Sequence, residues 1–301
     1  MSVNVLVTGC LGFLGRSLWE AFEEREEVIL WGVYRSGHSD CRRQLYCDLT
    51  DIDAASWVME FTKPDIVIHA AANPLVRVEA PCSITVDNVV ATHNLLAACP
   101  AGARFVLVSS LSVLGARLDE GPVAMGDECR PVSVYGASKL AAEYYLEAHH
   151  RQGRVVGSIV RPVAMVGPRS THGLLHDVVR KLRSHARSLE LIGQAPGACK
   201  PFAYVDDVAR CIVELAMEKY PSEELRPLHL GPLDHLTVME VAEMAMRALE
   251  IYKPIQWGLP GWAGDQAVVR LREAYQHYHP RYSTSRDAVQ AALEEYVVAI
   301  S

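Results

Sequence analysis

A tyrosine and a lysine stand four positions apart in the segment YGASK at residues 135–139. On a helix, Tyr135 and Lys139 lie one turn apart on the same face, so the ammonium can approach the phenol. A free phenol has a pKa of about 10, and bringing it near neutrality takes roughly 4 kcal/mol of preferential stabilisation of the phenolate. Ser110, at the end of an apolar run, offers a hydroxyl to the same substrate oxygen. These three side chains predict proton transfer to or from that oxygen.

Glycines recur at every third position in the segment TGCLGFLG at residues 8–15, directly after an apolar run. Such glycines allow a tight turn and let the backbone approach a pyrophosphate, whose charge is met by N–H groups at a helix N-terminus. A strand-to-helix turn can also need glycine for packing alone. With a strand before it and a helix after it, the segment predicts a dinucleotide site formed by Gly9, Leu11, Gly12, Phe13, Leu14 and Gly15. The tyrosine would then move its proton as hydride moves to or from a nicotinamide.

The second apolar run ends in Arg35 and Ser36, where NAD-specific enzymes usually place an acid that holds the ribose hydroxyls. A cation and a hydroxyl suit a 2′-phosphate instead, so we predict NADP, with NAD as the alternative if Arg35 is an ordinary surface residue. Asp48 follows a further short run. Its carboxylate can accept a hydrogen bond from the adenine amino group, or it can cap a helix.

Short β-rich runs alternate with helical patterns over the first two-thirds of the chain, at residues 3–7, 28–33, 66–69, 105–108 and 155–160. This alternation predicts an α/β fold, with right-handed βαβ units and a doubly wound parallel Rossmann sheet. After Gly167 the pattern predicts helices at 174–187, 237–250 and 285–296 and a strand at 189–193, with a capping box of Thr237 and Glu240. We expect a dinucleotide-binding domain at 1–166 with a return near 199–231, and a smaller, partly helical substrate domain at 167–198 and 232–301.

The composition narrows the functional class. The chain has 301 residues with a formal net charge of −7, the wrong sign for a protein that binds nucleic acid or anionic lipid. No basic segment precedes the first apolar run and no membrane-spanning segment is evident, so we expect a cytoplasmic protein. The eight cysteines form no C-x-x-C pair, and His149 and His150 lack the spacing that converges on one ion. We therefore expect no metal site.

Further motifs follow in order along nearly the whole chain. They are Asp48-Leu49, HAAA at 69–72, Asn88, SSLSVLG at 109–115, Arg161-Pro162, Gly167-Pro168 and YVDDVA at 204–209. With the glycine loop and YGASK, they make the chain similar to the extended short-chain dehydrogenase/reductase family, in particular its NAD(P)-dependent sugar-nucleotide epimerase/dehydratase branch. The resemblance also implies a homodimer built from the two long helices beside the active site.

The resemblance implies roles for residues that spacing alone does not assign. The residues that would contact the cofactor, in addition to Tyr135 and Lys139, are Leu49, Ala70, Ala71, Asn88, Pro162 and Val163. Lys200 occupies the place where family members put a basic residue against the substrate diphosphate. The residues that we expect around the substrate are Asn73, Ser112, His172 and Lys200.

Departures from the family pattern narrow the reaction. Leu111 and Ser112 stand where 4,6-dehydratases have an Asp-Glu pair, and Ser112 replaces the cysteine of enzymes that epimerise two carbons, although His172 or His176 could supply their histidine. We therefore predict reduction or single-centre epimerisation of a keto or hydroxy centre on a nucleotide-activated sugar.

Ala164 and Val166 replace an asparagine and a tyrosine that sugar-nucleotide enzymes often carry. Two alternatives therefore stay open. One is an NADPH-dependent ketoreductase acting on a steroid-like or phenolic ketone. The other is a non-catalytic NADP-sensing protein, which would have no need of the serine, tyrosine and lysine.

Overall fold

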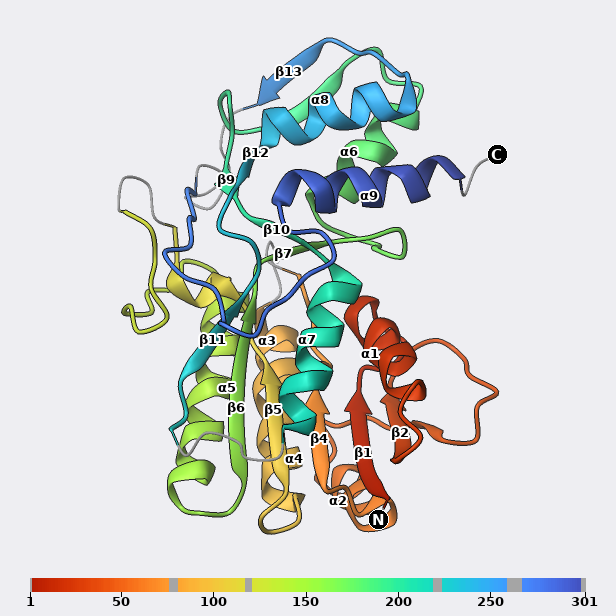
Figure 1. Cartoon of the computed structure of the whole chain (residues 1–301), viewed down its shortest axis with the longest axis vertical. Coiled ribbons are helices and arrows are strands. Elements are labelled where there is room, and N and C mark those ends of the chain that lie inside the picture. The colour runs from red at the N-terminus through yellow and green to blue at the C-terminus, as the bar shows by residue number, and fades with distance from the viewer. Residues whose placement is uncertain (1, 76–80, 117–120, 219–223, 259–266, 299–301) are drawn as a thin grey trace. The chain divides into compact units, whose positions relative to one another are not determined.

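The computed structural model of the chain describes residues 2–75, 81–116, 121–218, 224–258 and 267–298. Its largest sheet has the strand order β11-β6-β5-β4-β1-β2-β3 (Figure 1). The strands are β1 (Val3–Thr8), β2 (Val28–Tyr34), β3 (Gln44–Tyr46), β4 (Ile66–His69), β5 (Arg104–Val108), β6 (Val156–Pro162) and β11 (Pro227–Leu230). All pairings from β3 to β6 are parallel. The order is that of a Rossmann sheet, which confirms the predicted fold class.

Helices cover both faces of this sheet. In Figure 1, α1 and α7 lie in front of the strands, and α2, α4 and α5 lie behind them. Their bounds are Phe13–Glu23 for α1, Val205–Met217 for α7, Ile52–Thr62 for α2, Ala91–Ala98 for α4 and Val134–Arg151 for α5. Leu14, Leu18 and Phe22 of α1 are buried, as their helical spacing predicts.

The chain divides into two compact units. The first comprises the described residues within Met1–Val113, Ser133–Arg161 and Ala209–Leu228, and the second those within Leu114–Val132, Pro162–Val208 and His229–Ser301. That the first unit binds the dinucleotide and the second the substrate stays a prediction.

The second unit is built around three helices, α6 (Leu174–Arg183), α8 (Val238–Leu249) and α9 (Ser285–Val298), which share an apolar core. Its short strands are β7 (Ala164–Val166), β8 (Leu189–Ile192), β9 (Cys199–Lys200), β10 (Phe202–Tyr204), β12 (Leu236–Thr237) and β13 (Ile255–Gly258). They form the two-stranded sheets β10-β7, β12-β9 and β13-β8.

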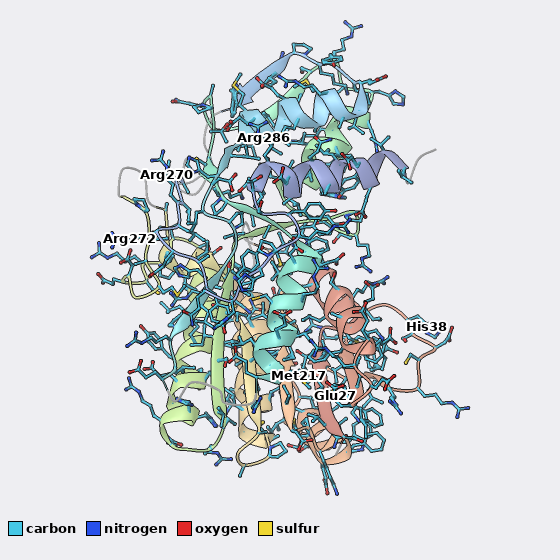
Figure 2. All side chains as sticks on the ribbon, viewed as in Figure 1. Glu27, His38, Met217, Arg270, Arg272 and Arg286 are labelled. Atoms are coloured by element: carbon cyan, nitrogen blue, oxygen red, sulfur yellow. The ribbon has the colours of Figure 1, made fainter. Side chains whose placement is uncertain are left out.

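In the second unit, the predicted start of α8 is confirmed and the predicted end of α6 is wrong. The predicted capping box is confirmed, since Thr237 accepts from the Glu240 N–H and the Glu240 carboxylate accepts from the Thr237 N–H at 2.8 Å. Arg286, labelled in Figure 2, pairs with the other Glu240 oxygen at 3.6 Å. The predicted helix 174–187 is too long, because Ser184 has extended backbone and ends α6 at Arg183.

Candidate active site

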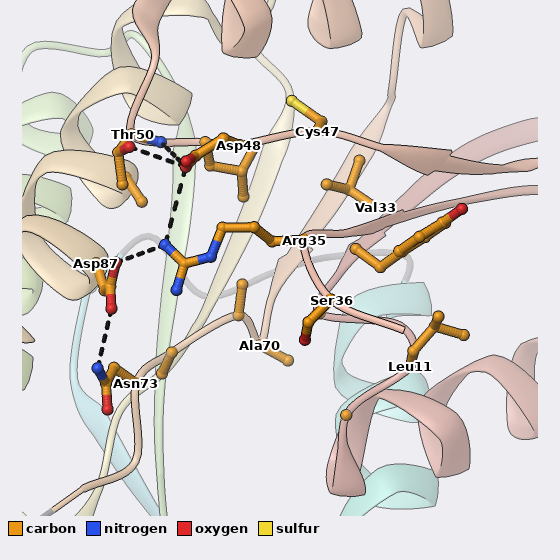
Figure 3. A pocket seen from close by; sticks show the side chains of 17 residues that line it. Leu11, Val33, Arg35, Ser36, Cys47, Asp48, Thr50, Ala70, Asn73 and Asp87 are labelled. Atoms are coloured by element: carbon orange, nitrogen blue, oxygen red, sulfur yellow. Dashed lines mark hydrogen bonds and ion pairs between the residues drawn. The ribbon is translucent and has the colours of Figure 1, made fainter. Parts of the chain in front are cut away.

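A hollow of about 220 Å³ opens at the carboxyl ends of the central strands of the first unit (Figure 3). Parallel sheets bind ligands at this edge, where the strand order reverses beside β1. The hollow brings together these predicted cofactor residues: Gly9, Leu11, Gly12, Arg35, Ser36, Asp48, Leu49, Ala70 and Ala71. Asn73, predicted to contact substrate, also lines it.

The glycine loop packs the end of β1 against both β4 and α1. Gly9 has φ +70°, and a Cβ there would lie 2.9 Å from the Cα of Ala71. A Cβ on Gly15 would lie 1.9 Å from the Gly9 carbonyl oxygen, so Gly15 serves helix packing. Gly12 is the N-cap of α1, with neither a side-chain cap nor an acid in the first turn. The helix N-terminus therefore has N–H groups for an anion, which fits a pyrophosphate.

Arg35 extends from the end of β2 into the hollow, toward two carboxylates (Figure 3). Its Nη1 donates to Asp87 Oδ1 at 2.5 Å and lies 3.9 Å from Asp48 Oδ1. The second Asp87 oxygen accepts from Asn73 Nδ2 at 2.9 Å. The Arg35 hydrogen bond holds the pKa of Asp87 below its ordinary value, and Asp87 in turn raises the pKa of Arg35.

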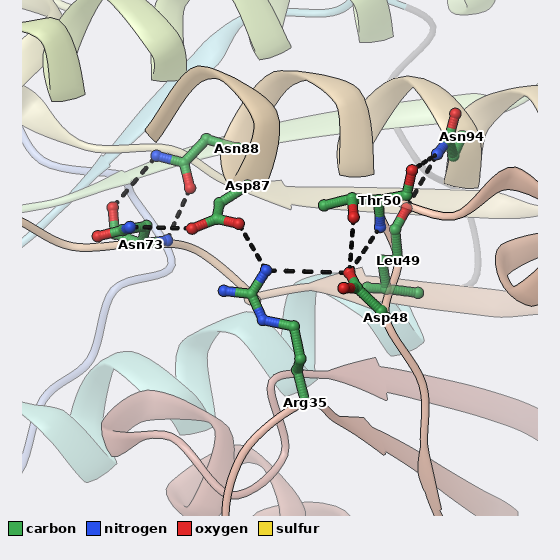
Figure 4. Close-up of polar contacts among 8 residues, drawn as sticks. All are labelled: Arg35, Asp48, Leu49, Thr50, Asn73, Asp87, Asn88 and Asn94. Atoms are coloured by element: carbon green, nitrogen blue, oxygen red, sulfur yellow. Dashed lines mark hydrogen bonds and ion pairs between the residues drawn. The ribbon is translucent and has the colours of Figure 1, made fainter. Parts of the chain in front are cut away.

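Asp87 and Asn88 lie on a single π-helical turn, Val86–Val90, of the kind that often marks functional sites. Asn88 is buried and pairs twice with the Asn73 backbone, at 2.7 and 3.2 Å. It also donates to Ser138 Oγ at 3.0 Å, and Ser138 donates to the Tyr135 carbonyl at 2.7 Å. A chain of polar contacts therefore runs from Arg35 through Asp87 and Asn73 to Asn88 (Figure 4). Ser138 continues it to the first turn of α5.

The turn after β3 bears on the two roles that the sequence leaves open for Asp48, a contact with adenine or a helix cap. Asp51, not Asp48, caps α2, accepting from the Asp53 N–H at 2.9 Å. Asp48 Oδ1 accepts from the Thr50 N–H at 3.0 Å and its hydroxyl at 2.8 Å (Figure 4). The helix-cap interpretation of Asp48 is thus wrong, and its half-exposed carboxylate faces the hollow.

Ser133 caps α5, accepting from the Gly136 N–H at 3.0 Å, so the helix begins at Val134. Tyr135 therefore lies in its first turn. Burial raises the pKa of the Tyr135 phenol, and a hydrogen bond with Ser110 acts in the opposite direction. Ser110 Oγ lies 3.1 Å from Ser112 Oγ and accepts from the Ser112 N–H at 3.1 Å. The structure therefore brings the predicted Ser110, Ser112 and Tyr135 together.

Lys139 lies one turn further along α5 and is buried. Burial lowers its pKa to about 8, while the Glu143 carboxylate acts in the opposite direction. Glu143 is held by Arg161 through contacts of 2.9 and 2.7 Å, and by the Ser109 hydroxyl. Lys139 thus lies one helical turn before Glu143, which belongs to a buried, hydrogen-bonded ion pair.

His69, at the end of β4, is a second buried group beside Lys139. Its ring nitrogens contact Thr8 Oγ1 at 2.8 Å and Thr92 Oγ1 at 2.9 Å. Burial, reinforced by the Lys139 charge, lowers its pKa to about 3, so the imidazole is neutral. It therefore joins β1, β4 and α4 without adding charge.

The other predicted site residues belong to the second unit. Lys200 places its ammonium 5.8 Å from the Phe202 ring centroid, and burial lowers its pKa. Burial also lowers the pKa of His172, which precedes α6. Pro162 ends β6, and the Val163 N–H donates to Leu230 at 3.0 Å. The roles expected for these residues stay predictions.

Some predicted cofactor residues do not line the hollow, and others were missed. Among the described residues, the predicted cofactor residues that do not line it are Phe13, Leu14, Gly15, Asn88, Tyr135, Lys139, Pro162 and Val163. The additional lining residues are Val33, Tyr34, Cys47, Thr50, Ala72, Asp87 and Ala91. Most of these are sequence neighbours of predicted residues. Asp87 contacts Arg35 across 52 positions, and the only sequence signal for it is its place before Asn88.

Residues 5–226 match the model of the NAD dependent epimerase/dehydratase family. The chain belongs to this family. It is therefore an NAD(P)-dependent member of the extended short-chain dehydrogenase/reductases, as the motifs predict. None of the helices within the described ranges is long and apolar enough to cross a membrane.

The relatives of the chain are named for different activities. The chain is 28% identical to UDP-glucuronic acid decarboxylase 6 of Arabidopsis thaliana over 267 residues, 84% of this chain and 75% of the relative. It is 27% identical to methionine adenosyltransferase 2 subunit beta of Xenopus laevis over 251 residues, 80% and 70% of the two chains. A solved UDP-galactose 4-epimerase is similar with a TM-score of 0.83 and 26% identity, covering 99% of this chain and 100% of that one.

Proposed function

We propose that Ser110, Tyr135 and Lys139 move a proton at a keto or hydroxy centre of the substrate while the nicotinamide supplies or accepts hydride. The observation that carries this proposal is the hydrogen bond between Ser110 and Tyr135, which lies in the first turn of α5, with Lys139 one turn further along the helix. Ser110 would hold the substrate oxygen, and Tyr135 would exchange the proton with it. The Lys139 ammonium would favour the phenolate after the proton has left.

Tyr135 could supply the proton that reduction of a ketone requires. Burial raises its pKa, so the phenol keeps its proton at neutral pH in the cofactor-free protein. A protonated phenol is the donor that carbonyl reduction requires, whereas oxidation of a hydroxyl begins with a proton acceptor. Because ketoreductases exchange NADPH at every turnover and Arg35 favours NADP(H), we rank reduction of a ketone before single-centre epimerisation, which would run both steps in turn.

For the substrate we propose a nucleotide-activated sugar with a 4-keto or 4-hydroxy centre. Relatives named UDP-glucuronic acid decarboxylase and UDP-glucose 4-epimerase support this class. Lys200 offers a cation for the diphosphate, and His172 is the second group that we place near the substrate. Because Leu111 and Ser112 replace an acid pair, elimination of water is not proposed.

A screen of nucleoside diphosphates tests the substrate class. With cofactor present, one of UDP, dTDP, GDP or CDP should raise the thermal midpoint, and the shift should shrink with salt because charged contacts are screened. Lys200→Ala should lose that shift. If no diphosphate stabilises the protein and Lys200→Ala keeps full activity, the sugar-nucleotide assignment is wrong, and an uncharged ketone becomes the better substrate.

For the cofactor we propose NADP(H), with NAD(H) as the alternative. Arg35 and Ser36 line the hollow, and β2 is not followed by an acid that would repel a 2′-phosphate. Paired titrations of the wild type and Arg35→Ala test this. The variant should lose affinity for NADP and keep its affinity for NAD, and equal behaviour of both proteins toward both cofactors would restore the NAD interpretation.

A second candidate is cofactor binding without turnover. It is favoured by the match to methionine adenosyltransferase 2 subunit beta, a protein named as a subunit of another enzyme. The presence of Ser110, Tyr135 and Lys139 weighs against it. Cofactor oxidation that starts only when the stabilising nucleotide sugar or ketone is added would exclude this candidate.

We further propose a homodimer formed through α4 and α5, where Tyr144 and Tyr145 are exposed. Sedimentation velocity would test it, and a species of 33.2 kDa at all concentrations would contradict it. The cytoplasmic location stays a prediction.

A further inference from the structure

In the proposed NADP site, Arg35 is the cation that would bind the 2′-phosphate. Its guanidinium also faces two carboxylates. Arg35 contributes one positive charge, and Asp87 and Asp48 contribute one negative charge each within 4 Å of its Nη1 (Figure 4). The three groups together carry a charge of −1. A phosphate monoester arriving at Arg35 therefore meets a cation whose field is already more than neutralised.

We propose that Asp87 is a specificity-determining residue that limits the preference of this pocket for NADP over NAD by holding the Arg35 guanidinium. The proposal rests on the proposed function, because it requires a dinucleotide in the hollow. It assigns Arg35 two partners that exclude each other: Asp87 when the ribose carries a free 2′-hydroxyl, and the phosphate when it does not.

The position of Asp87 does not depend on Arg35. Its second oxygen accepts from Asn73 Nδ2 at 2.9 Å, and Asn73 is itself fixed through its backbone by the buried Asn88. The carboxylate therefore stays at the edge of the hollow when Arg35 turns toward a ligand. It then contributes repulsion to a 2′-phosphate and an acceptor to a ribose hydroxyl, both of which favour NAD.

Asp87 acts more strongly than Asp48 by its geometry. Asp87 Oδ1 makes a direct hydrogen bond of 2.5 Å with Arg35, whereas Asp48 Oδ1 lies 3.9 Å away and already accepts twice from Thr50. The Asp87 side chain is also 14% exposed against 45% for Asp48, so water screens it less. Removing the Asp87 charge should therefore release Arg35, while removing the Asp48 charge should do less.

The test is a double-mutant cycle on cofactor affinity. Dissociation constants for NADP and NAD are measured by calorimetric titration for the wild type, Asp87→Asn, Arg35→Ala and the double variant. Asparagine keeps the shape of the side chain and can still accept from Asn73. We expect Asp87→Asn to raise the ratio Kd(NAD)/Kd(NADP) about tenfold, mostly through tighter NADP binding, since both charges lie at a partly exposed site. In the Arg35→Ala background the same change should raise it less than about threefold.

Two further variants keep the result specific. Asp40→Asn also removes one negative charge, from the exposed loop after β2, and it should leave the ratio unchanged. Asp40 contacts His38, which is labelled in Figure 2. If Asp87→Asn is poorly folded, Asp87→Ser removes the same charge and should raise the ratio in the same direction.

The outcomes separate this inference from the proposed function. If the wild type binds neither NADP nor NAD, the proposed function fails. If both cofactors bind and neither Asp87 variant changes their ratio, this inference alone is overturned. If Asp87→Asn has the same effect with and without Arg35, Asp87 acts by direct repulsion, and the proposed competition for Arg35 is wrong.

Discussion

Two of the arginine–carboxylate pairs in the first unit differ mainly in burial. Arg35 and Asp87 meet at the hollow with side chains 48% and 14% exposed, whereas the side chains of Arg161 and Glu143 are 4% and 5% exposed. Water competes for the first pair and not for the second. The exposed pair can therefore exchange partners when a charged ligand arrives, whereas the buried pair cannot open without leaving an uncompensated charge.

This difference assigns the pairs to different tasks. Arg35 and Asp87 lie where a ligand would bring its own charge, so a weak, exchangeable contact suits selectivity. Arg161 and Glu143 support Lys139, whose pKa depends on fixed surroundings.

The largest effect is expected on the reaction rate, at Tyr135, one helical turn before Lys139. Tyr135→Phe removes the proposed proton-transfer group, and kcat on an authentic substrate should fall by about 10² to 10⁴. Cofactor affinity should be nearly unchanged, because the ring and its packing remain. Steady-state rates and cofactor titration measure both quantities. Tyr252→Phe, at an exposed tyrosine of the second unit, serves as the control, and full turnover by Tyr135→Phe would remove the assignment.

The next largest effect is expected on stability when the buried pair is broken. Glu143→Gln leaves the Arg161 charge buried without its carboxylate, and the free energy of unfolding should fall by about 3 to 5 kcal/mol. Denaturant unfolding measures this. Glu147→Gln is the matched control one turn along α5, where the Arg151 pair is exposed, and it should cost under about 1 kcal/mol. Equal losses for the two variants would show that burial does not distinguish them.

The elements of the fold could be predicted because their signals are local. Apolar runs placed β1, β2, β4, β5 and β6 within a residue or two, and Thr237 with Glu240 marked the start of α8. The end of α6 could not be placed, since Ser184 leaves the helix without a glycine or proline to mark the stop.

The site was predictable only where chain neighbours form it. The glycine loop and the α5 segment each appear within a few positions of sequence. The Arg35–Asp87 contact joins the end of β2 to a π-helical turn, and no spacing rule connects two such segments. The sequence also left the role of Asp48 open, because the cap of α2 is fixed by the conformation of the turn after β3, where Asp51 accepts the helix N–H groups.

A smaller effect concerns the dependence of stability on pH. The Lys139 pKa is about 8 in the folded protein and about 10.4 in an unfolded chain. Between these values the unfolded state binds more protons at this group, so its contribution makes stability rise with pH. The free energy of unfolding of the wild type minus that of Lys139→Met should therefore increase by about 2 kcal/mol from pH 7.5 to 9.5.

The difference between the two proteins is needed because other buried groups oppose Lys139. Burial raises the pKa of Cys10 and Cys99 to about 12, so the folded state keeps thiol protons that the unfolded chain loses above pH 9. Both proteins carry these thiols, so their contribution cancels in the difference. A difference that stays flat from pH 7.5 to 9.5 would mean that Lys139 is not held in a buried, charge-disfavouring site.

The smallest effect is expected when the exposed pair is broken. Arg35→Ala should lower the free energy of unfolding of the cofactor-free protein by less than about 1 kcal/mol, since the Arg35 side chain is half exposed and water replaces it around Asp87. Any loss in the free energy of unfolding that Arg35→Ala causes should vanish near 1 M salt, where charges are screened over about 3 Å. A loss of several kcal/mol that persists in salt would make Arg35 structural like Arg161. In that case weaker NADP binding by Arg35→Ala would reflect a damaged hollow rather than a missing phosphate contact.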